Sequence, residues 1–80
     1  MFKTLLRIGT VALDDRLVPV RYFELRTLRG AKRYSAEILL GPGDQIILDD
    51  DSVCNLEARA NRLVPATVYS RLLAARATAA

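Results

Sequence analysis

Apolar and polar residues alternate most regularly between Tyr34 and Leu40, in the middle of the chain. Because successive side chains of a strand point to opposite faces, this alternation predicts a strand with one apolar side. The core side would carry Tyr34, Ala36, Ile38 and Leu40, and the other side Arg33, Ser35, Glu37 and Leu39. Residues 41–44, Gly-Pro-Gly-Asp, then predict a turn, since proline presets φ and glycine tolerates φ > 0. Residues 45–48 predict the strand that follows.

The apolar pattern also predicts how these two strands pair. A loop that spans residues 41–45 keeps the apolar set on a single face, whereas a loop shorter by one residue scatters it over both faces. The longer loop therefore predicts the core-side pairs Leu40–Ile46 and Ile38–Leu48, and the outer-side pair Leu39–Ile47. Leu39 and Ile47 would then form a small apolar patch on the outer face.

Two further strands are expected before this hairpin. Residues 2–13 combine a helix-like apolar spacing with β-favouring Ile8 and Val11, and we interpret them as a strand. Residues 17–28 are rich in Val, Tyr, Phe and Leu, which favours another strand, with Pro19 near its start or along an edge. Between the second and third strands, Gly30 adopts φ > 0 at little cost, so residues 28–32 predict a hairpin tip.

The rest of the chain predicts two helices. Asp51 or Ser52 can cap the first, whose apolar stripe is Val53, Leu56, Ala60 and Leu63. Pro65 lacks a backbone donor and clashes with the preceding turn, so we expect it to end this helix and begin the next. The second helix would run to about Arg76, with an apolar side made of Val68, Tyr69, Leu72, Leu73 and Ala75.

These elements predict an α+β fold: a small antiparallel β-meander of three to four strands, followed by two C-terminal helices packed on one face. We expect residues 1–80 to form one domain. The composition, 51% hydrophobic and 26% charged, is that of a globular chain. A chain this short has a thin core, so we expect extra stabilisation from a homodimer. The residues expected at the self-contact are Leu39, Ile47, Val68, Tyr69, Leu72 and Leu73.

No arrangement of side chains predicts catalysis. The acidic run 49–51 lacks the ligand spacing of a calcium loop, and we interpret it as helix capping rather than a metal site. Cys54 has no histidine to activate it, since the chain contains none. We therefore expect no catalytic residue, no cofactor and no metal. Tyr34 and Tyr69 fall on expected core faces, so we interpret them as packing residues rather than as a stacking surface.

The most concentrated charge lies at the expected hairpin tip. Four cations fall within eight residues there: Arg26, Arg29, Lys32 and Arg33. Such a finger can contact the phosphates of a nucleic acid, bind an acidic protein, or keep a sheet edge soluble. The net charge of the chain, +3, is a mild excess that does not choose among these roles.

Composition also bears on location and function. No stretch reaches the roughly 20 apolar residues of a membrane span, and a lone cysteine does not point to an oxidising compartment. We expect a cytoplasmic protein that does not enter membranes. The favoured function is a non-catalytic interaction or regulatory module that acts as a homodimer through protein–protein contacts. The alternative is a nucleic-acid-binding regulator that uses the basic hairpin at residues 26–33.

Overall fold

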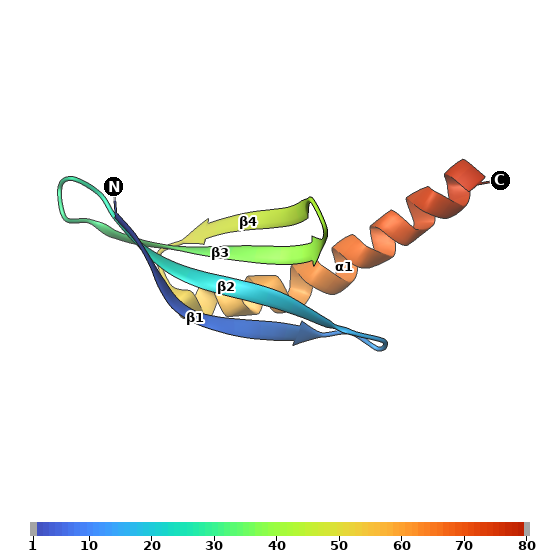
Figure 1. Cartoon of the computed structure of the whole chain (residues 1–80), viewed down its shortest axis with the longest axis horizontal. Coiled ribbons are helices and arrows are strands. Elements are labelled where there is room, and N and C mark those ends of the chain that lie inside the picture. The colour runs from blue at the N-terminus through green and yellow to red at the C-terminus, as the bar shows by residue number, and fades with distance from the viewer. Residues whose placement is uncertain (1, 80) are drawn as a thin grey trace.

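The computed structural model describes the backbone of residues 2–79 and the side chains of residues 2–77. Four strands and one helix follow one another along the chain: β1 (Phe2–Ala12), β2 (Leu17–Arg26), β3 (Lys32–Gly41), β4 (Asp44–Asp50) and α1 (Val53–Ala79). The strands form one antiparallel sheet in the order β1-β2-β3-β4 (Figure 1). The predicted α+β class and β-meander are confirmed, and the ambiguous N-terminal stretch is a strand.

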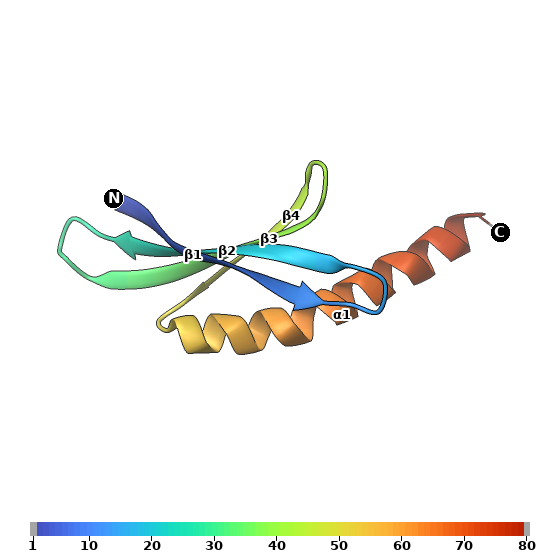
Figure 2. The same ribbon diagram turned by 60° about the horizontal axis from the view of Figure 1, so that its bottom comes forward.

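The first half of α1 packs on one face of the sheet and closes the core (Figure 2). Leu56, Ala60 and Val64 follow one another at intervals of four, and each is 0% exposed. This spacing keeps them on one stripe of the helix. The buried apolar residues are Val11, Val18, Val20, Tyr22, Ala36, Ile38, Leu40, Leu48, Leu56, Ala60 and Val64. Val64, rather than the expected Leu63, completes the buried stripe, and Leu63 is half-buried.

The prediction of two helices is wrong, because α1 continues through Pro65. Its axis turns beyond the sheet-covered half, as expected when proline removes a hydrogen bond and crowds the preceding turn (Figures 1 and 2). Val64 before Pro65 is buried and Val68 after it is half-buried against the core. Packing on both sides of the proline therefore favours a bent helix over a break. Over its described residues, α1 lacks the combination of length and apolar character that a bilayer-crossing helix needs.

The predicted loop between β3 and β4 is also wrong. Pro42 and Gly43 form a two-residue turn, in which Gly43 has φ +70°. The register shifts at Leu40, the extra residue of a β-bulge, and Ile38 faces Ile46. The apolar faces are kept as expected, but the pairing slides by two residues. In consequence Ile47 lies opposite Glu37 and not opposite Leu39.

The tight turn predicts that replacing Gly43 or Gly41 by alanine lowers the free energy of unfolding by different amounts. Gly43→Ala should lower the free energy of unfolding by about 1 kcal/mol, because an L residue is strained in the left-handed region. Gly41→Ala is the matched control, since a Cβ there meets no atom within 4 Å and φ is not positive. Urea unfolding followed by circular dichroism compares the two. An equal loss of unfolding free energy in the two variants would contradict the turn geometry.

Candidate interaction surfaces

One face of the sheet is left uncovered by α1 (Figure 2). Strand alternation places a set of apolar side chains on this outer face: Leu5, Ile8, Leu17, Phe23, Leu25, Leu39 and Ile47. Ile8, Leu17 and Ile47 are each at least 60% exposed. Leu39 and Ile47 lie on this face as predicted, although they are not paired. Sequence reasoning missed the larger part from β1 and β2, because it did not establish which face of those strands the helix covers.

A charged cluster sits at the centre of the outer face. The Glu37 carboxylate accepts hydrogen bonds from Lys3 Nζ at 2.5 Å and from Arg21 Nη2 at 2.8 Å. Its side chain is only 10% exposed. The hydrogen bond from Lys3, helped by the charges of Lys3 and Arg21, lowers the pKa of Glu37, although burial opposes the shift. Lys3 also lies over the Phe23 ring, 4.3 Å from its centroid.

The four cations of the basic hairpin, residues 26–33, are mostly neutralised within the chain. Arg26 and Lys32 both approach Glu24, at 3.3 and 3.6 Å. Arg33 pairs with Asp49 at 2.9 Å and also with Asp51. Among the ion pairs of residues 2–77, none involves Arg29. The structure therefore brings the predicted basic residues together with carboxylates, and not as an isolated positive finger.

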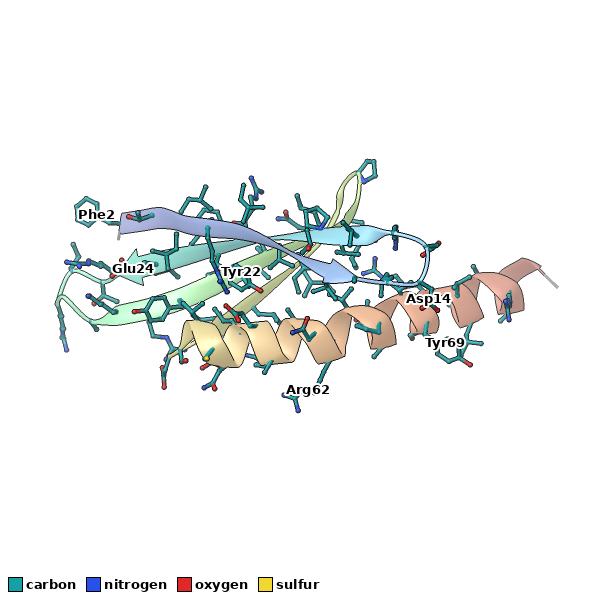
Figure 3. All side chains as sticks on the ribbon, turned by 90° about the horizontal axis from the view of Figure 1, so that it is seen from below. Phe2, Asp14, Tyr22, Glu24, Arg62 and Tyr69 are labelled. Atoms are coloured by element: carbon teal, nitrogen blue, oxygen red, sulfur yellow. The ribbon has the colours of Figure 1, made fainter. Side chains whose placement is uncertain are left out.

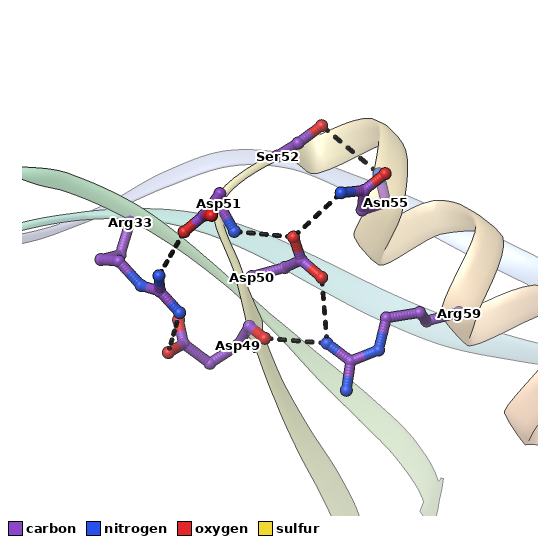
Figure 4. A network of polar contacts seen from close by, with 7 residues as sticks. All are labelled: Arg33, Asp49, Asp50, Asp51, Ser52, Asn55 and Arg59. Atoms are coloured by element: carbon purple, nitrogen blue, oxygen red, sulfur yellow. Dashed lines mark hydrogen bonds and ion pairs between the residues drawn. The ribbon is translucent and has the colours of Figure 1, made fainter.

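The acidic run 49–51 links the end of β4 to the start of α1 (Figure 4). Asp50 accepts hydrogen bonds from the Asn55 amide at 3.1 Å and from Arg59 at 3.2 Å. The hydrogen bond from Asn55 is the main cause that lowers the pKa of Asp50. Ser52 Oγ accepts from the backbone N–H of Asn55 at 3.4 Å and caps the helix. Within the described residues, no group of three or more metal-ligating side chains gathers here or elsewhere.

The tyrosines and the cysteine take positions that bear on function. Tyr34 is half-buried against the core, as expected, but Tyr69 is 64% exposed, so its interpretation as a core residue is wrong. Tyr69 follows the bend, where the helix has left the sheet. Tyr22 is buried instead, and its burial raises the pKa of its hydroxyl. Cys54 is an exposed free thiol.

The half of α1 after Pro65, here called the arm, extends past the sheet and carries the other predicted contact residues. Val68 is half-buried, whereas Tyr69, Leu72 and Leu73 are exposed by 64%, 50% and 46%. A groove of about 500 Å³ lies between the arm and the β1–β2 turn. It is lined by Ala12, Leu13, Asp14, Asp15, Pro65, Val68, Tyr69 and Leu72. Figure 3 shows Asp14 above the arm.

The charges around Glu37 predict a pH-dependent contribution to stability. Because its pKa in the folded chain lies below the ordinary value of 4.5, the carboxylate stabilises the fold above that value and loses this effect as pH falls through the lowered pKa. The unfolding free energy of the wild type should therefore exceed that of Glu37→Gln at neutral pH, and the gap should narrow in acid. Denaturation at fixed protein concentration from pH 7 to pH 3 measures it. A gap that stays constant would contradict the charge effect.

Comparison with known proteins gives no further guide to these surfaces. The chain matches no protein-family model, no curated protein and no solved structure. Its function is therefore inferred from the outer face, the hairpin and the arm.

Proposed function

We propose that this protein is a non-catalytic interaction module that acts as a homodimer, with the outer sheet faces of two copies packed against each other. The observation that carries the proposal is the uncovered apolar face, on which Ile8, Leu17 and Ile47 remain mostly in solvent. Exposed apolar side chains grouped on one face, here around the charged cluster, are typical of interaction sites. A two-fold contact requires only one surface, which must be complementary to itself.

The size of the outer face is sufficient for a stable contact. Strands of ten residues, as in β2 and β3, are about 33 Å long, and four strands are about 19 Å wide. The product is a face of roughly 600 Å² per copy, or about 1,200 Å² for a pair. This value lies at the lower end of the range for specific protein–protein interfaces.

The charged cluster holds two cations for one carboxylate, so the contact must leave the surplus cation in solvent, where Lys3 and Arg21 are 48% and 41% exposed. Covering an unpaired carboxylate is costly, but Glu37 is already paired with Lys3 and Arg21 of its own chain. The Arg21 Nε atom, in contrast, is buried without a hydrogen-bond partner. An unsatisfied buried donor costs about 1–3 kcal/mol, and because this atom is closed to solvent, an acceptor of a second copy reaches it only if the Arg21 side chain moves.

The homodimer is tested by a charge placed on the outer face. Ile47→Lys should reduce the mass measured by light scattering at micromolar concentration from twice the chain mass toward the single chain, because a lysine at the contact must lose its hydration. Leu28→Lys is the matched control, since Leu28 is 93% exposed at the hairpin tip and away from this face. Circular dichroism verifies that both variants fold. A wild type that is monomeric throughout would refute the proposal.

The second candidate is a nucleic-acid-binding regulator. It is favoured by the exposed Arg29, which has no ion pair among the described residues, at the tip of the basic hairpin. The internal pairing of Arg26, Lys32 and Arg33 counts against it, because a phosphate would have to compete with Glu24 and the acidic run.

Titration against duplex DNA and RNA at several salt concentrations distinguishes the candidates. For an interaction module we expect no binding at low ionic strength, where even unspecific phosphate attraction is strongest. Binding that falls steeply with salt, with a log–log slope reduced by roughly 2 in Arg29→Ala/Lys32→Ala, would instead establish the nucleic-acid role.

A further inference from the structure

The apolar stripe of α1 that closes the core continues into the arm, where the sheet no longer covers it. Leu56, Ala60 and Val64 are fully buried, and the same interval of four leads to Val68 and then to Leu72, which is 50% exposed. Residues spaced by four form a continuous ridge on a helix. The arm therefore presents an apolar ridge beside an apolar groove.

Two grooves flank this ridge. Among the described side chains, the carboxylate at the rim of one groove is ion-paired, whereas those at the rim of the other are not. The groove on the β3–β4 side is bordered by Asp44, which pairs with Arg71 of the arm. The groove on the β1–β2 side is bordered by Asp14 and Asp15, which are exposed. Across residues 2–77, neither of these carboxylates takes part in an ion pair.

A matching unpaired cation lies farther along the same arm. Arg76 is exposed, and within the described side chains it also has no ion pair. It is seven residues beyond Tyr69, or roughly 10 Å along the helix axis. One copy thus carries an acidic groove rim and a basic arm end that are separated along the arm, so each is available to another molecule.

We propose that the arm of a second copy lies antiparallel in the β1–β2 groove, and that Arg76 of each copy pairs with Asp14 and Asp15 of the other. With a two-fold axis near Leu72, Arg76 of the second copy arrives beside Val68 of the first, roughly 6 Å beyond the axis. Val68 lines the groove whose rim is Asp14 and Asp15. The apolar ridge of each arm covers the floor of the other copy's groove. One charged contact, Arg76 with Asp14 and Asp15, forms at the rim of each of the two grooves.

This contact is separate from the outer-face contact, because the arm extends past the end of the sheet and does not lie on its outer face (Figure 2). Both can form at once. Two different two-fold contacts join dimers either into a closed tetramer or into an open chain. In the closed tetramer, two arm contacts join the same two dimers, so each contact strengthens the other through effective concentration.

The test is cross-complementation between two charge-reversed variants, measured by sedimentation equilibrium in the Ile47→Lys background. Arg76→Glu and Asp14→Lys/Asp15→Lys should each weaken self-association roughly tenfold, since two rim pairs become repulsive. An equimolar mixture of the two should associate as tightly as the parent, because both rim pairs are then again of opposite charge. Arg62→Glu is the matched control, as Arg62 is on the same helix and points away from the sheet (Figure 3).

The outcomes separate this contact from the proposed homodimer. A mixture that associates no more tightly than either variant alone, or a parent that does not associate at millimolar concentration, would overturn the arm contact. If Ile47→Lys has the same mass as the wild type, the outer-face dimer is refuted. The association of the equimolar mixture of charge-reversed variants then still tests the arm contact on its own. Circular dichroism excludes unfolding as the cause in every variant.

Discussion

Every strand has two faces, and residues 2–79 contain a single helix with which to cover them. Val20 and Ile38, on the covered face, are 0% exposed because Leu56, Ala60 and Val64 lie in the same core. The side chains that alternate with them, on the outer face, pack only against neighbouring side chains of the sheet. Hydrophobic burial is therefore more extensive on the covered side than on the other. This asymmetry determines which surfaces are available to partners.

Much of the charge within residues 2–77 is paired inside the chain. The chain has a net charge of +3, yet its densest group of cations faces Glu24 and the acidic run. Arg33 and Arg59 bind that run from the sheet and from the helix (Figure 4). Electrostatic interactions thus hold the strand–helix junction together, and a count of charges overstates the attraction for polyanions.

Much of the fold could be predicted from local signals in the sequence. The alternation of apolar and polar residues predicted which face of β3 is covered. Gly30 and Gly43 have the positive φ that their turns require. The errors arose where distant contacts outweigh local preference. The helix passes through Pro65 because packing holds it on both sides, and a bulge at Leu40 restores the apolar faces after a shorter turn. The site was less predictable, because the pairing around Glu37 depends on the order of β1, β2 and β3.

The proline within α1 has a further consequence for how the chain folds. Pro65 cannot donate the hydrogen bond that would join its turn to Asn61, so the ladder is interrupted where the helix leaves the sheet. The segment beyond it has about 14 residues, a length at which an isolated helix is only marginally stable in water. Val68 packs against the core and Arg71 pairs with Asp44, so the sheet supports the start of the arm more than its end. The end of the arm can unravel while the sheet stays intact, and contact with another molecule would then stabilise the helix there.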